Sequence, residues 1–263
     1  MIHGPGPDPA APVPIDVLGV RVNAATMEGV VRLIESWIAQ QLPRYVCVSG
    51  MHGVMESQRD ERLRRIHNSA GLVTTDGMSL VWLCKLKGNQ PVERVYGPDL
   101  MLELCGRSAH RGYRHFFYGA SPEVLERLVG RLQTRFPGLL VVGTFSPPFR
   151  PLTAAEDADV VARIREARPD VVWVGLSTPK QERWMADYVE RLAGPVLIGV
   201  GAAFDFHAGV KRQAPRWMQR NGLEWLFRLL SEPRRLAGRY LVNIPLFAWY
   251  LLLDRMGLRT YLR

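Results

Sequence analysis

Cysteine is scarce in this chain of 263 residues, and the three cysteines stand far apart at positions 47, 84 and 105. The chain has no Cys-x-x-Cys pair, so neither a disulfide framework nor a structural zinc site is indicated. We therefore expect three buried thiols in a reducing compartment.

The motifs of several enzyme classes are missing as well. The sequence has no Gly-x-Ser-x-Gly elbow, no Walker loop and no His/Cys cluster with metal-ligand spacing. Residues 199–204 resemble a dinucleotide fingerprint but lack its last glycine, which argues against an NAD enzyme. We expect these glycines to let the backbone approach a phosphate or a nucleotide instead.

Long apolar runs are also absent. The most apolar stretch, residues 244–253, is ten residues long and contains Pro245, whereas a membrane-spanning helix needs roughly 20. The C-terminal part should therefore lie on a membrane without crossing it. Residues 1–14 lack the basic start and apolar core of a signal peptide, and their Pro, Gly and Ala content predicts a flexible leader.

Net charge is almost absent from the first 206 residues, because nearly all of the net +9 falls in residues 207–263. That tail has eleven Lys or Arg and three Asp or Glu, with aromatic residues between them. This mixture favours an anionic membrane surface, and a solvated helical surface is the alternative. Nucleic acid is disfavoured as a partner, because the tail has no recognition motif and its apolar residues suit lipid better.

Short apolar runs alternate with helical patterns before this tail. The runs cover residues 45–48, 72–74, 115–118, 139–142, 171–174 and 196–200, and most are apolar throughout, as in parallel strands buried on both faces. The helical patterns cover 26–40, 60–68, 98–110, 122–136, 153–167 and 179–192, and residues 16–23 could add an edge strand pair. The alternation predicts an α/β domain over residues 15–206, with a doubly wound, mainly parallel, Rossmann-like sheet, followed by a helical appendage over residues 207–263.

Ligands bind at the carboxyl ends of the strands in such a sheet. Asp76 lies in a Thr-Asp-Gly turn there and could act as a general base, although Asp-Gly is also ordinary turn chemistry. His115, inside a strand, is expected to be a core residue. The residues expected to contact a substrate are Ser49, His52, Thr75, Tyr118, Gly119, Ala120, Thr178, Lys180, Gly201 and Asp205.

Two predicted helices begin at this edge with a hydroxyl residue followed by proline, at Ser121 and Thr178. Their N-termini could hold a diphosphate. Gln181 could either close a Thr-x-x-Gln capping box with Thr178 or contact a ligand. Arg94 and Asp99 lie in a loop leading into a helix and could pair with each other or face substrate.

Asp157-Ala-Asp159 matches the D-x-D pattern that binds Mn²⁺ in many sugar-nucleotide transferases. A capping box formed by Thr153 and Glu156 places both aspartates in the first turns of an amphipathic helix. We therefore interpret them as solvated helix residues rather than metal ligands.

Taken together, these motifs resemble the bacterial WecG/TagA/CpsF glycosyltransferases (glycosyltransferase family 26). The resemblance runs from about residue 16 to residue 250, and the order and spacing of its motifs make it specific. The matching stretches are 75–78 with Trp82, 94–99, 117–120, 175–182, 199–206, 214–217, 222–226 and 232–235.

The resemblance implies a peripheral enzyme at the cytoplasmic face of the cell membrane. Such an enzyme moves a sugar from a UDP-sugar, typically of the N-acetylmannosamine type, to a polyprenyl-diphosphate-linked sugar in cell-surface polysaccharide synthesis. The reaction would invert the anomeric carbon and use no metal and no cofactor. Asp76 is implied as the base, Arg94 and Gln181 as active-site residues, and Arg234 or Arg235 as the tail's contribution, neutralising the departing UDP.

The chain departs from the family at the end of its first long strand. Many members have a Thr-x-Asn motif there, where this chain reads Cys-Val-Ser-Gly-Met-His over residues 47–52. An amide that could contact sugar or acceptor is therefore missing, and Ser49 and His52 could take over its contact. Thr75 also stands where Pro is common.

These differences leave the donor sugar open between N-acetylmannosamine, a uronic acid, a hexose and another sugar. A catalytically inactive polysaccharide-assembly adaptor of the same fold is the alternative function, and the intact Asp76, Arg94 and Gln181 argue against it. Homo-oligomer formation is left open by the sequence.

Overall fold

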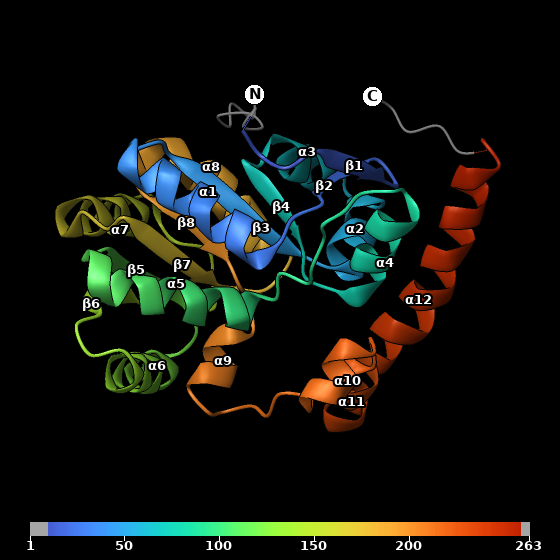
Figure 1. Cartoon of the computed structure of the whole chain (residues 1–263). Helices are drawn as coiled ribbons and strands as arrows, with labels where there is room; N and C mark the ends of the chain where they lie inside the picture. The colour runs from blue at the N-terminus through green and yellow to red at the C-terminus, as the bar shows by residue number, and fades with distance from the viewer. Residues whose placement is uncertain (1–9, 259–263) are drawn as a thin grey trace.

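The computed structural model describes residues 10–258, and in them six parallel strands form one sheet in the order β4-β3-β8-β7-β5-β6. Helices cover both faces of this sheet (Figure 1). The strands are β3 (Arg44–Ser49), β4 (Leu72–Thr75), β5 (Arg114–Gly119), β6 (Leu140–Phe145), β7 (Val171–Gly175) and β8 (Val196–Gly199). The predicted doubly wound α/β fold is confirmed. Most of the predicted leader, residues 1–9, lies outside the described residues.

A short antiparallel hairpin precedes the sheet. Its strands are β1 (Pro14–Val17) and β2 (Val20–Asn23), which confirms the strand pair expected from residues 16–23. The Asn23 side chain joins the hairpin to the sheet, because its Oδ1 accepts a hydrogen bond of 2.9 Å from the backbone N–H of Val73 in β4.

Two layers of helices enclose the sheet, and each forms its own core with one sheet face. One layer contains α1 (Met27–Ala39), α5 (Gly97–Arg111), α6 (Pro122–Arg135) and α9 (Ala203–His207). The other contains α2 (Met51–Ser57), α3 (Glu61–Ser69), α4 (Met78–Leu86), α7 (Ala154–Ala167) and α8 (Lys180–Leu192). Sequence patterns missed α2 and α4, because each is separated from the preceding strand by at most two residues and has a glycine N-cap that provides no side-chain hydrogen bond.

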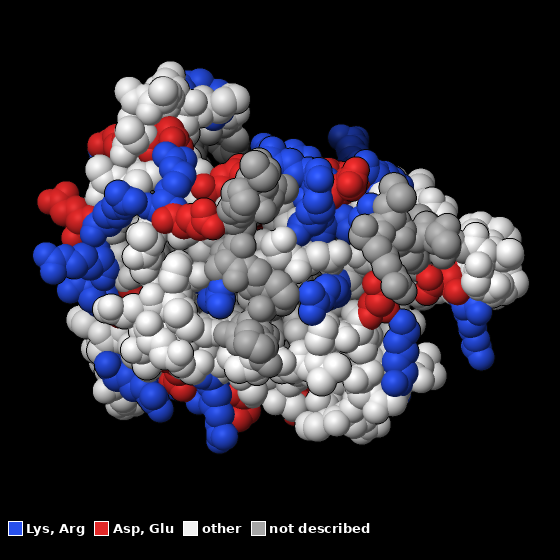
Figure 2. Space-filling view, turned by 90° about the horizontal axis from the view of Figure 1, so that it is seen from above, with Lys and Arg blue, Asp and Glu red and all other residues white. Residues whose placement is uncertain are grey.

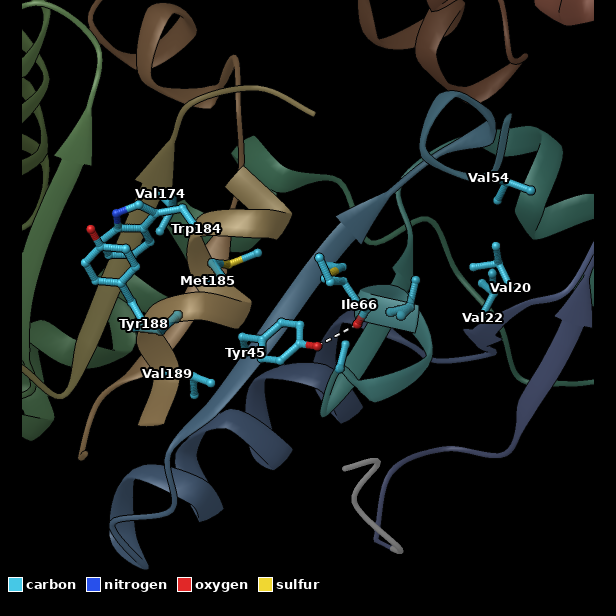
Figure 3. Packing of buried hydrophobic residues seen from close by; sticks show 14 of the residues in the cluster. Val20, Val22, Tyr45, Val54, Ile66, Val174, Trp184, Met185, Tyr188 and Val189 are labelled. Carbon is cyan, nitrogen blue, oxygen red and sulfur yellow. Dashed lines mark hydrogen bonds between the residues drawn. The ribbon is translucent and has the colours of Figure 1, made fainter. Parts of the chain in front are cut away.

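Alternation along β3 shows how one strand serves both cores. Tyr45 and Cys47 belong to the core on the α8 side, whereas Val46 and Val48 belong to the core on the α1 side. In the α8-side core the Tyr45 hydroxyl donates to the Ile66 carbonyl, and the Trp184 and Tyr188 rings stack with centroids 4.4 Å apart (Figure 3). The three cysteines are buried free thiols, as expected.

The edge strand β6 differs from its prediction. Its expected span was 139–142 with full burial, but the strand runs over Leu140–Phe145 and is only partly buried. An edge strand has a neighbour on one side only, so an apolar sequence does not ensure its burial. Gly143 allows the Phe116 ring to approach, since a Cβ at Gly143 would lie 2.4 Å from Phe116 Cε2.

The chain leaves the α/β body after α9, whose Phe204 is buried in the core. The tail then forms α10 (Arg216–Arg220), α11 (Glu224–Ser231) and α12 (Pro233–Arg255), and α12 lies beside α2 (Figure 1). Charges do not separate into large blocks on the face seen in Figure 2, where basic side chains lie among acidic ones.

Helix α12 is longer than the ten-residue apolar stretch that the sequence indicated. It continues through Pro245 for 23 residues, and by length and composition alone it could cross a membrane. One side of the helix packs on the body through Leu236, Asn243 and Phe247. Trp249 and Leu252 remain exposed.

A matched pair of glycine substitutions tests the packing between β7 and α9. A Cβ at Gly175 would lie 2.6 Å from Phe204 Cδ2, whereas a Cβ at Gly130 in α6 meets nothing within 4 Å. We expect Gly175→Ala to lower the free energy of unfolding by about 1–3 kcal/mol, and Gly130→Ala to raise it by about 0.5–1 kcal/mol. Urea denaturation of both variants measures this difference, and equal effects would contradict the packing.

Candidate functional site

A cleft of about 320 Å³ opens at the carboxyl ends of β3, β7 and β8. The α/β body forms its floor, and α11 and α12 of the tail contribute part of its wall. Of the predicted site residues, the cleft brings together His52, Asp76, Ala120, Thr178, Gln181, Gly201, Asp205 and Arg235.

Asp76 is the acidic residue at the end of β4. Its Oδ1 accepts a hydrogen bond of 3.1 Å from the backbone N–H of Gly97, which fixes the carboxyl group at the cleft. Burial raises the pKa of Asp76 to about 6, with Arg94 opposing the rise and Glu224 adding to it. A carboxylate of this kind is ionised at neutral pH and is a stronger base than an ordinary aspartate, as a general base requires.

Arg94 connects the loop of Asp76 to the tail. Its Nε donates to the backbone carbonyl of Asp76, and its Nη2 forms an ion pair with Glu224 of α11. The guanidinium lies 3.9 Å from the centre of the Tyr96 ring, and the Tyr96 hydroxyl donates to Glu224 at 3.2 Å. Arg94 itself is not among the cleft-lining residues, so it holds the wall of the site.

The alternative that Arg94 pairs with Asp99 is wrong. Asp99 accepts instead from Arg216 of α10, at 2.7 Å. Arg94 in the loop and Asp99 in the first turn of α5 therefore both bind residues of the tail, which lie more than a hundred positions later in the chain.

Gln181 lines the cleft from the first turn of α8. The predicted Thr-x-x-Gln capping box is not formed, because α8 begins at Lys180 with Pro179 in the cap position. The Thr178 hydroxyl and the Gln181 amide both donate to Oε1 of Glu182, at 2.9 and 3.0 Å. Of the two roles expected for Gln181, closing a capping box and contacting a ligand, only ligand contact is compatible with this geometry.

Gly199, the last residue of β8, and Gly201, two residues later, have different surroundings. A Cβ at Gly199 would lie 2.7 Å from Met185 Cε and 3.2 Å from Gln181 Cδ. Gly199 therefore makes room for the Met185 and Gln181 side chains of α8. Gly201, with φ of +52°, lines the cleft.

Ser49 ends β3 and His52 follows it in α2, but only His52 lies at the cleft. His52 lines the cleft, and burial together with Arg239 lowers its pKa to about 4, so its ring is neutral at physiological pH. The Ser49 hydroxyl lies beneath α2, where a Cβ at Gly53 would be 2.1 Å from it. Ser49 is not a cleft-lining residue, and this position does not support the contact predicted for it.

Tyr118 and Lys180 line a second, adjoining cavity of about 980 Å³. The Tyr118 ring stacks on Trp184 with centroids 4.2 Å apart, which gives this cavity an aromatic wall. Asp205 and Lys211 border both cavities, so the two spaces are direct neighbours.

Thr75 and Gly119 lie outside both cavities. The Thr75 hydroxyl donates to the Glu93 carbonyl at 2.7 Å and so supports the loop that carries Arg94. A Cβ at Gly119 would lie 2.7 Å from the Gly175 carbonyl oxygen. The structure therefore gives both residues a supporting position rather than a direct place at the cavities.

Cations from the tail line the cleft, and most were missed in the sequence. Arg228, Arg235 and Arg239 line it, whereas the exposed Arg234 does not. Arg235 pairs with Glu232, while Arg228 and Arg239 have no ion pair within residues 10–258. Burial, and then the nearby Arg235, lower the pKa of Arg239. Arg235 and Arg239 are four positions apart, and this spacing could have indicated from the sequence that they share one face of a helix.

The two aspartates of the D-x-D pattern, Asp157 and Asp159, bind other side chains of the protein. Asp157 binds Tyr188 and Arg191, and Asp159 pairs with Arg163 at 2.6 Å. The capping box that places them on α7 is present. In the part of the chain that the structure describes, no three His, Cys, Asp or Glu residues are grouped so that they could hold a metal ion.

The family model and the individual proteins that match this chain are all glycosyltransferases. The model of the glycosyl transferase WecG/TagA/CpsF family matches residues 15–261. An N-acetylglucosaminyldiphosphoundecaprenol N-acetyl-beta-D-mannosaminyltransferase of Bacillus subtilis strain 168 is 27% identical over 241 residues, which cover 91% of each chain. A Staphylococcus aureus strain MW2 protein of the same name is 29% identical over 238 residues, which cover 89% of this chain and 91% of its own.

Proposed function

Because the chain belongs to the WecG/TagA/CpsF family of glycosyltransferases, we propose that it moves a sugar from a UDP-sugar to a sugar carried on a polyprenyl diphosphate. The names of the Bacillus and Staphylococcus relatives support N-acetylmannosamine as the donor sugar and N-acetylglucosamine as the acceptor sugar. The observation that carries the proposal is the partly buried Asp76 carboxyl, which shares a cleft with Arg228 and Arg239, two arginines that have no ion pair in the described chain.

The two adjoining cavities suggest how the donor lies. We place the nucleoside in the larger cavity, against the aromatic wall that includes Tyr118 and Trp184. The diphosphate then lies where the cavities meet, near Lys211, with Arg228 and Arg239 within the same cleft. This arrangement points the donor sugar towards Asp76 and Gln181.

The proposed reaction is a single displacement. Asp76 takes the proton from the acceptor hydroxyl while that oxygen attacks the anomeric carbon of the donor. The bond from the anomeric carbon to the UDP oxygen breaks on the opposite side, so the configuration inverts. Arg228, Arg235 and Arg239 neutralise the charge that develops on the departing diphosphate, which is our reason for proposing a metal-independent reaction.

We place the protein peripherally at the cytoplasmic face of the membrane, and features of the tail support the peripheral binding. Arg235 and Arg239 line the cleft, so the first turns of α12 belong to the site. The remainder, residues 240–255, is shorter than the roughly 20 residues that a spanning helix needs. Its exposed Trp249 and Leu252 can enter the interfacial layer while nearby cations contact anionic headgroups.

Vesicle binding tests this orientation. We expect the double variant Trp249→Ser/Leu252→Ser to bind anionic vesicles about tenfold more weakly or worse, because two large apolar side chains are lost from the interface. Phe149→Ser is the matched control, since Phe149 is equally apolar and fully exposed but lies on a loop of the α/β body. Co-sedimentation measures both, and equal losses would contradict the assignment of the docking face to α12.

The function itself is tested by mass spectrometry of a short-chain polyprenyl-diphosphate N-acetylglucosamine incubated with a panel of UDP-sugars. One donor should add its sugar mass to the acceptor, with UDP-N-acetylmannosamine as the first candidate and a UDP-uronic acid as the second. UDP binding without transfer from any donor would favour the non-catalytic adaptor of the same fold.

A further inference from the structure

A buried carboxylate lies directly behind the cleft, and the proposed reaction does not use it. Glu182 is fully buried in the first turn of α8. Its Oε1 accepts two hydrogen bonds, from the Thr178 hydroxyl at 2.9 Å and from Gln181 Nε2 at 3.0 Å. Both donors are residues that line the cleft.

The chemistry of these partners determines which way the Gln181 amide faces. The atom of Gln181 that lies 3.0 Å from Oε1 of Glu182 is the amide nitrogen, which is a donor, and the Thr178 hydroxyl donates to the same oxygen. The amide oxygen is then directed away from Glu182. That oxygen is buried, has no hydrogen-bond partner in the described chain, and would lie 3.5 Å from a Cβ at the cleft residue Gly201.

We propose that Glu182 is a positioning residue that fixes Gln181 as a hydrogen-bond acceptor in the cleft. A substrate hydroxyl or amide N–H is the group that this oxygen binds, because a buried acceptor without a partner is unfavourable. The hydroxyls of a sugar and the N–H of an N-acetyl group have this chemistry, whereas a phosphate oxygen does not. The identity of the substrate rests on the proposed function, but the orientation of the amide does not.

Side-chain amide NMR tests the orientation without any activity. The Gln181 NH₂ signal, assigned by its absence from Gln181→Ala, should exchange slowly with solvent in the full-length protein. Glu182→Leu removes the acceptor and should speed this exchange by tenfold or more, whereas Glu182→Gln retains a carbonyl acceptor and should keep the protection. Fast exchange in the wild type would overturn the proposal.

Kinetics test the consequence for the reaction. Glu182→Leu should lower kcat/KM by about tenfold or more, and Glu182→Gln should restore it to within about threefold of the wild type. In a Gln181→Ala background the further Glu182→Leu change should cost less than about twofold, since Glu182 acts through Gln181. Additive losses, or Glu182→Gln as poor as Glu182→Leu, would overturn the positioning role.

A matched control separates positioning from stability. Glu35 in α1 is also buried and pairs with Arg107 and Arg111, away from the cleft. Glu35→Leu should lower stability without changing the Gln181 exchange rate or kcat/KM, and an equal change in exchange would overturn the proposal. If the wild type transfers no sugar at all, the proposed function fails while the NMR result still decides the orientation.

Discussion

Replacing Asp76 by Asn is expected to lower turnover by about 100-fold or more, the usual scale for loss of a general base, while leaving UDP affinity nearly unchanged. Asn retains an oxygen that can accept the hydrogen bond from Gly97, so the loop is held as before. The variant loses only the ability to take a proton. Initial rates at saturating substrates, together with calorimetric titration of UDP, measure the two effects separately.

The pH profile gives the same variant a second readout. Burial raises the pKa of Asp76 to about 6, so the carboxyl is protonated and inactive as a base below that pH. In the wild type kcat/KM should therefore rise as pH increases through about 6 and level off above it. Asp76→Asn should lack this rise. Near-normal turnover, or an unchanged acid limb, would remove Asp76 from the mechanism.

The second large effect is expected at Arg239. This guanidinium is half-buried, lines the cleft and has no ion pair in residues 10–258. Arg239→Gln should lower kcat by about 100-fold, comparable to the loss of one preorganised donor that stabilises a developing negative charge. The loss should be larger in kcat than in UDP affinity, because the charge on the leaving group grows in the transition state.

Arg234→Gln is the matched control for this prediction. Arg234 lies on the same helix but is exposed and does not line the cleft. We expect Arg234→Gln to retain kcat within about twofold, as is usual for an exposed side chain away from the site. Similar losses in the two variants would mean that the tail acts through its net charge rather than through placed arginines.

Local patterns were sufficient to predict most of the body of the fold. Apolar runs such as 171–174 and 196–200 match buried parallel strands, because both faces of the sheet are covered. Helices with recognisable caps, such as α7 with its Thr153–Glu156 box, were also predicted. Helices α2 and α4 were not, because a glycine N-cap looks like a turn when only the sequence is read.

The site was predicted where its residues follow strands and missed where it depends on distant contacts. Asp76 directly follows β4, and Gln181 lies in the first turn of the helix that follows β7, so their place at the cleft follows from the sheet alone. The ion pair between Arg94 and Glu224 spans 130 positions, and no local pattern reports it. The choice between Arg234 and Arg235 likewise depends on how α12 packs against the body, which places Arg235 at the cleft.

Acceptor-dependent release of UDP in excess EDTA tests the central claim most directly. The measurement compares the wild type with Asp76→Asn, using the donor identified by the mass-spectrometric panel and a polyprenyl-diphosphate-linked N-acetylglucosamine. The account predicts rapid release by the wild type that requires the acceptor, is unchanged by EDTA and falls about 100-fold or more in the variant. Release that EDTA abolishes and Mn²⁺ or Mg²⁺ restores, or that persists in Asp76→Asn, would contradict it.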